Sequence, residues 1–144
     1  MDERYTRYIE NLRRVRALAR PETHAGMKAA DLLEEIKQNA AESYTLMQQS
    51  NAILDEVIFS RRAENLTEEE AAGLSEFAGK LFHYANSEDC GIAYKIHALL
   101  LDYARLKQDD RAIIRELYWA GVTRHYMNVR SDGSSINPLG KQVR

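Results

Sequence analysis

Cys90 and the histidines are the side chains of this sequence that could bind a metal ion or act in catalysis. His83, Cys90 and His97 are spaced seven residues apart, which aligns them only approximately on one helix face, and neither they nor His125 form a recognised zinc-ligand pair. Cys90 is expected in the first turn of a helix, where the dipole favours a thiolate, but no base and orienting acid stand beside it. We predict neither a metal site nor a catalytic cysteine.

The common catalytic and cofactor-binding signatures are absent. The sequence has no GxGxxG, GxxxxGK[ST], HExxH or CxxC motif, which removes the usual phosphate-binding, metalloprotease and redox patterns. We therefore predict that the chain is not itself an enzyme and needs no cofactor.

His97 interrupts the strongly apolar stretch GIAYKIHALLLDYARL, residues 91–106. A histidine in such a stretch lies either in the wall of a binding site or inside a helix bundle. The structural interpretation is favoured, because a buried polar group must be paired. In that case His97 hydrogen-bonds a tyrosine hydroxyl or a carbonyl of a neighbouring helix. Tyr94, on the same stretch, is a second candidate for contact with a ligand or partner.

The run RELYWAGVTRHYMN, residues 115–128, is the most distinctive aromatic segment. Tyr118 and Trp119 are adjacent and point to different sides of a helix, so at least one of them faces something beyond the immediate core, whether a helix, a partner or a ligand. Gly121 inside a helix costs about 1 kcal/mol relative to alanine, which suggests close approach of another helix. Tyr126 completes the candidate binding residues Tyr94, His97, Tyr118, Trp119 and Tyr126.

Apolar residues at helical spacing predict an all-α array of about five to six antiparallel helices. A first helix precedes Pro21, and the loop PETHAG leads to a helical region over about 27–63 that is one helix or two with a break near residue 50. A capping box at Thr67 and Glu70 begins the next helix, Ser87 can cap another, and Asp109 or Asp110 caps a last helix over about 110–128. The stripe expected to pack in the second region is Leu33, Ile36, Ala40, Tyr44, Met47, Leu54 and Val57.

Length and composition predict one domain over residues 1–128, followed over 129–144 by a loop and the start of an unfinished helix at Asn137 and Pro138. Such an ending leads us to expect that the chain is cut from a longer polypeptide. A formal charge of −2 gives no reason to expect nucleic-acid binding. We expect a cytoplasmic location without direct membrane contact, because we find neither a signal peptide nor an apolar run long enough to span a bilayer.

The stretch GIAYKIHALLLDYARLKQDDRAIIRELYWAGVTRHYMN, residues 91–128, resembles a known family region. It is similar to the helical N-terminal region, built of tetratricopeptide-like helix pairs, found ahead of GGDEF diguanylate cyclase domains in some Firmicutes signalling proteins. The similarity is clearest over residues 66–128. Leu117, Ala120 and Gly121 match the large and small positions of a tetratricopeptide helix, whereas Arg124 stands where a tyrosine is usual.

The resemblance implies a tetratricopeptide-like helical repeat with a regulatory, sensory or dimerisation role in a signalling protein. The chain contains no GGDEF motif, so cyclase activity, GTP and magnesium are not assigned to its residues. The expected partner is a protein or peptide, or a second copy in a homodimer. The alternative is a free-standing helical adaptor that binds a protein or peptide partner.

Overall fold

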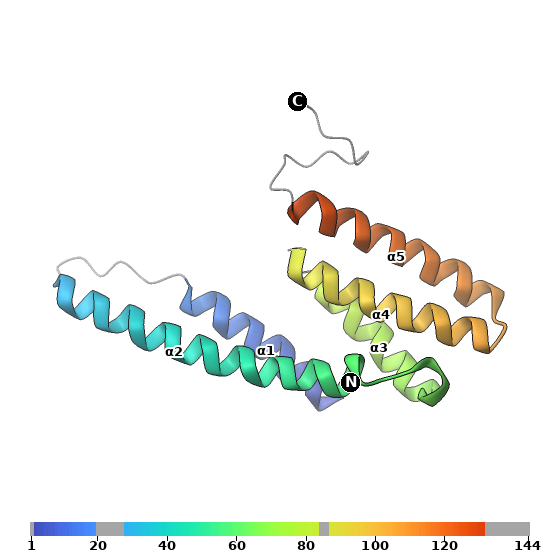
Figure 1. The fold of residues 1–144 in the computed structure, drawn as a ribbon, viewed down its shortest axis with the longest axis horizontal. Coiled ribbons are helices and arrows are strands. Elements are labelled where there is room, and N and C mark those ends of the chain that lie inside the picture. Colours follow the sequence, from blue (N-terminus) through green and yellow to red (C-terminus); the bar gives the residue numbers. More distant parts are fainter. Residues whose placement is uncertain (1, 20–27, 84–86, 132–144) are drawn as a thin grey trace, which may run out of the picture. The chain divides into compact units, whose positions relative to one another are not determined.

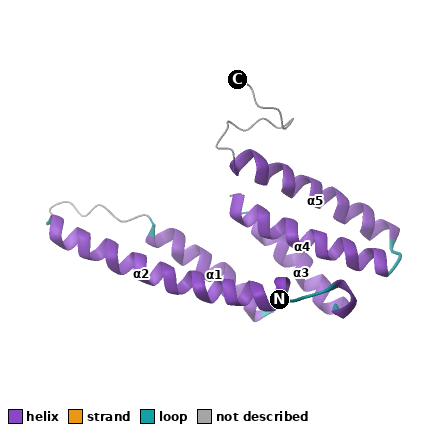
Figure 2. Cartoon of the chain, in the orientation of Figure 1, coloured by secondary structure: helices purple, strands orange, loops and turns teal. Residues whose placement is uncertain are grey.

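The described part of the chain is built from helices, as Figure 1 and Figure 2 show. The computed structural model describes residues 2–19, 28–83 and 87–131, and no strand occurs among them. The prediction of an all-α helical array is confirmed, while its tetratricopeptide-like character stays a prediction. The elements are α1 (Glu3–Leu18), α2 (Ala29–Leu54), the π-helical turn η1 (Asp55–Phe59), the 3-10 turn η2 (Ala63–Asn65), α3 (Glu68–Phe82), α4 (Ser87–Leu106) and α5 (Asp110–Ser131).

The contacts of these elements gather into two compact units. Residues 2–60 form the first unit, and the described residues from Arg61 onward form the second. That residues 1–128 form a single domain stays a prediction.

The first unit is an antiparallel pair of helices, α1 and α2 (Figure 1). Two ion pairs set their register, since Arg4 lies 2.6 Å from Glu56 near one end of the pair and Arg14 lies 2.7 Å from Glu42 further along. The apolar side chains buried in this unit are Tyr5, Tyr8, Ile9, Leu12, Ile53, Leu54, Val57 and Ile58.

The region around residue 50 forms one helix and not two. α2 runs without a break to Leu54, and η1 then ends it with a backbone hydrogen bond of 2.9 Å from Ser60 to the Asp55 carbonyl. Ser50 does not cap a new helix. It is buried inside the unit, where its hydroxyl accepts a hydrogen bond of 3.3 Å from the Asn11 amide. The polar residue that suggested a break is therefore the partner of a buried asparagine.

The stripe expected to pack along α2 is only half correct. Leu54 and Val57 are buried, but Leu33, Ile36 and Tyr44 are exposed. Leu54 and Val57 sit where α2 packs against α1, and the first half of the stripe lies on an outer strip of α2. Periodicity identified a helix here without identifying which of its apolar faces is covered.

In the second unit, α3 begins with the predicted capping box. The Thr67 hydroxyl accepts a hydrogen bond of 3.1 Å from the Glu70 backbone, and the Glu70 carboxylate accepts one of 3.0 Å from the Thr67 backbone. Glu70 also pairs with Arg61 at 2.6 Å. α3 then buries Leu74, Phe77, Ala78 and Leu81 against α4.

α4 and α5 form a tight antiparallel hairpin (Figure 1). Gln108 adopts a left-handed conformation with φ of 54°. The backbone N–H of Asp109 donates a hydrogen bond of 3.1 Å to the Ala104 carbonyl. This is the pattern of a Schellman C-cap. The Asp109 carboxylate then caps α5, as predicted, by accepting a hydrogen bond of 3.2 Å from the Ala112 backbone N–H. α5 continues to Ser131, three residues beyond the predicted end at Asn128.

Among the described residues no helix approaches Gly121 closely. A Cβ at Gly121 would meet no atom of the described part of the chain within 4 Å, so this glycine lies on an open face of α5. The close approach between α4 and α5 occurs instead at Gly91, where a Cβ would lie 3.3 Å from the Met127 sulfur. The predicted loop at residues 21–26, the side chain of Ser87 and the predicted helix start at residues 137–138 lie outside the described residues.

Candidate functional site

A buried histidine–glutamate pair joins α4 to α5. Nδ1 of His97 lies 2.6 Å from Oε2 of Glu116, and the two side chains are 7% and 2% exposed. The other oxygen, Oε1, accepts from Nε of Arg115 at 3.3 Å. The structural interpretation of His97 holds, but its partner is a carboxylate and not the tyrosine hydroxyl or carbonyl that was expected.

A chain of aromatic contacts extends from this pair. Trp119 stacks on His97 with ring centroids 6.1 Å apart and planes at 18°. Phe82, at the end of α3, meets the rings of Trp119 and Tyr126 edge-on at 6.0 and 5.6 Å. Edge-to-face arrangements are the favoured geometry of aromatic pairs and contribute about 0.5–1.5 kcal/mol each. We call His97, Phe82, Trp119 and Tyr126 the aromatic cluster.

The structure brings together three of the five candidate residues. His97, Trp119 and Tyr126 share the aromatic cluster. Tyr118 only touches its edge, with its ring 5.3 Å from that of Trp119, and most of its surface is open to solvent. Tyr94 is half-buried on α4 and makes no ring contact or hydrogen bond with the cluster.

Glu116 and Phe82 were missed by the sequence analysis. Glu116 shares a helix face with the buried residues Ala112 and Thr123, so an acidic residue at that position signalled a buried pair. The tight turn at Lys107–Asp109 also folds α5 back on α4, which places the region of Glu116 opposite His97. No sequence feature predicted that Phe82 would contact Trp119 and Tyr126. The sequence after Phe82 does not determine where the end of α3 lies relative to α5.

The aromatic cluster joins side chains of α3, α4 and α5. Glu116 is the polar partner of His97 that the structure shows, and the stacked Trp119 covers the imidazole ring. Cys90 is buried on α4 two helical turns before His97, a rise of about 10 Å. No group of three or more metal-binding side chains gathers within the described ranges.

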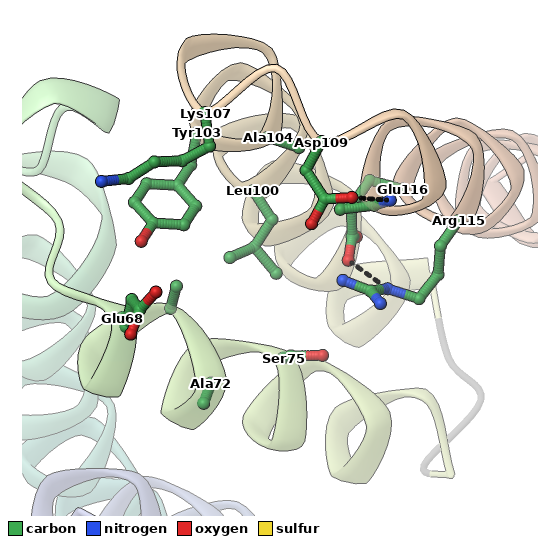
Figure 3. A pocket seen from close by; sticks show the side chains of 12 residues that line it. Glu68, Ala72, Ser75, Leu100, Tyr103, Ala104, Lys107, Asp109, Arg115 and Glu116 are labelled. Carbon is green, nitrogen blue, oxygen red and sulfur yellow. Dashed lines mark hydrogen bonds and ion pairs between the residues drawn. The ribbon is translucent and has the colours of Figure 1, made fainter.

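A shallow groove of about 600 Å³ runs over α4 between α3 and α5 (Figure 3). Leu100 and Ala104 line its base, and Arg115 reaches into it from α5 (Figure 3). At the other end Lys107 lies over the ring of Tyr103, with Nζ 5.6 Å from the ring centroid. The groove therefore combines an apolar base with charged side chains at its rim.

The outer face of α5 carries a second candidate site. Ile114, Leu117 and Tyr118 are 68, 49 and 62% exposed, and Gly121 continues the same face with open space above it. Their spacing of three and four residues puts the four on one side of the helix, opposite the buried Glu116 and Thr123. We call Ile114, Leu117, Tyr118 and Gly121 the outer strip of α5.

Among the helices that the structure describes, none combines the length and the apolar character needed to cross a bilayer. Comparisons with protein-family models, with curated proteins and with solved structures found no match to this chain. The resemblance to the N-terminal regions of GGDEF proteins therefore stays a prediction.

Proposed function

We propose that this chain is a non-catalytic, cytoplasmic regulatory or dimerisation module of a bacterial signalling protein that carries a diguanylate cyclase domain outside this chain. The observation that carries the proposal is the outer strip of α5, where three large apolar side chains face solvent on a well-formed helix. Single exposed apolar residues are ordinary, but a strip at helical spacing marks an interaction surface.

The arrangement of the titratable groups supports recognition as the role. His97, Glu116 and Arg115 are joined in one chain of contacts, and Asp109 caps α5. His97, Glu116 and Asp109 are thus engaged in contacts that hold helices together or begin one. A module of this kind regulates by binding one arrangement of its partner, or of its own copies, more tightly than another arrangement.

The test is a fusion of this chain ahead of a diguanylate cyclase domain, with the rate of cyclic di-GMP synthesis as the readout. Tyr118→Glu places a charge on the outer strip and should change the rate by several fold. Tyr44→Glu is the matched control, because Tyr44 on α2 is 66% exposed, close to the 62% of Tyr118. Equal rates for the wild-type fusion and the Tyr118→Glu fusion would contradict the proposal.

The alternative function is a free-standing adaptor that binds a peptide in the groove over α4. The volume of about 600 Å³ and the polar rim of Lys107 and Arg115 favour it. An adaptor should lose its partner on Tyr103→Ala and keep it on Tyr118→Glu, whereas a dimerisation module should show the reverse. A pull-down with both variants, at unchanged helical content, separates the two functions.

A further inference from the structure

We propose that two copies of this chain associate through the outer strip, α5 against α5, antiparallel about a twofold axis that passes between Leu117 and Tyr118. The inference rests on the proposed function, because it names a second copy as the partner of the regulatory surface. In such a pair the same edges of the two helices meet, and each residue lies opposite the residue of its own edge across the axis, at the same level to within about 1.5 Å of rise. The shape and the charges along α5 are both complementary to themselves under this twofold rotation.

The shape of the outer strip is complementary to itself. Ile114 is 68% exposed at one end, and Gly121, with no atom within 4 Å of its Cβ position, lies at the other end. The twofold axis places Ile114 of one copy over Gly121 of the other, and the reverse. Leu117 meets Leu117 and Tyr118 meets Tyr118 at the centre. A bulky side chain set against a glycine lets two helices approach closely, which accounts for a glycine inside a helix that packs against no other described residue.

The charges at the ends of the strip are complementary under the same operation. Asp110, Leu117 and Arg124 follow at intervals of seven and form one edge of the strip. In the antiparallel pair the same edges of the two helices meet, so Asp110 of each copy faces Arg124 of the other. Both side chains are exposed, and neither makes an ion pair or hydrogen bond to another described residue. On the other edge Arg111 faces His125, a pair that adds no attraction.

The other exposed apolar strip, on α2, lacks this self-complementarity. Leu33 and Tyr44 mark its two ends, and both are bulky and exposed. Pairing it with a copy would set these two large side chains against each other, and Lys37 beside it would face the uncharged Ala40. The choice between the two strips therefore follows from shape and charge and not from exposure.

The deciding experiment is a charge exchange on the whole chain, followed by sedimentation equilibrium. A helix pair of this length buries little area, so we expect a dissociation constant in the micromolar range. D110R and R124D should each weaken association about tenfold, because two symmetry-related attractions become repulsions. The double variant D110R/R124D should restore association to within about threefold of the wild type. Circular dichroism confirms that each variant keeps its helices.

A second series tests the shape argument. Gly121→Leu fills the space that Ile114 of the other copy would occupy, and should weaken association about tenfold. Gly79→Leu is the matched control, because Gly79 is also in a helix with no atom within 4 Å of its Cβ position. It should leave association unchanged.

The outcomes separate this inference from the proposed function. A chain that stays monomeric at high micromolar concentration overturns the pairing, as does a double variant that associates as weakly as its parents. A cyclase fusion that still responds to Tyr118→Glu in either case would leave the regulatory function standing with another partner. Equal loss of association with Tyr44→Glu and Tyr118→Glu would show non-specific adhesion and would also overturn the pairing.

Discussion

The His97–Glu116 pair shows what a single residue can reveal from the sequence. A histidine inside an apolar helix had to have a polar partner, and it does. The identity of that partner depended on the register of α4 against α5, which the turn at Lys107–Asp109 sets to within about one helical turn. Within that margin Glu116, Trp119 and Ala120 were all possible neighbours, so the type of partner could not be derived.

The pair should contribute strongly to stability. Glu116→Ala leaves the buried His97 without its partner and should lower the free energy of unfolding by about 3 kcal/mol. Glu116→Gln keeps a hydrogen-bonding group of the same shape and should cost about 1 kcal/mol. Urea denaturation followed by circular dichroism measures both.

Two further variants make this result specific. Arg115→Ala removes only a contact of a mostly exposed side chain, at 59%, and should cost less than about 1 kcal/mol. In the cycle with His97→Ala the two single losses should not add, and the coupling should be about 1–3 kcal/mol. Additive losses would mean that the His97–Glu116 contact does not stabilise the fold.

At the scale of elements, local sequence signals located most helices well and their packed faces less well. The capping box at Thr67 and Glu70 and the cap at Asp109 act over three residues and were read directly. The packed face of α2 depends on where α1 lies, and the same apolar periodicity allows more than one face. For a related reason, the helix propensity cost of Gly121 does not say whether the neighbour that offsets it lies within the chain or in another copy.

The capping box makes the stability of α3 depend on pH. The Arg61 guanidinium, then the hydrogen bond from the Thr67 backbone, lowers the pKa of Glu70 from 4.5 to about 2. A carboxyl whose pKa is lower in the folded state contributes stability above its unfolded pKa and loses that contribution as pH falls through the folded pKa. The stabilising effect of Glu70 should therefore be complete above about pH 5 and fade toward pH 2.

Glu70→Gln tests this directly. The variant should be less stable than the wild type at pH 7 and should approach it as the pH falls toward 2, in thermal melts followed by circular dichroism. Glu69→Gln is the control, because Glu69 is exposed in the same turn outside the capping box. A constant difference between Glu70→Gln and the wild type over the whole range would contradict the assignment.

At the scale of the molecule, the sequence indicated an all-α chain and the structure divides it after Ser60. No glycine or proline marks that division, and the chain passes through η1 and η2 with ordinary helix-forming residues on both sides. Composition shifts could not reveal it. The units differ in content, because the aromatic cluster, the groove and the outer strip of α5 all belong to the unit from Arg61 onward.

This division predicts how the chain behaves when it is separated at residue 60. The unit from Arg61 onward has a core that its own helices supply, with Phe77 and Leu81 from α3 and Ala93 and Ile96 from α4 fully buried. A fragment of residues 61–144 should therefore unfold cooperatively on heating and should self-associate as the whole chain does, because it retains α5. A fragment of residues 1–60 should not self-associate under the same conditions. Differential scanning calorimetry and sedimentation measure the two properties separately. A fragment of residues 61–144 that folds but stays monomeric, beside a dimeric whole chain, would move the interface to the first unit and so exclude α5 as the surface of association.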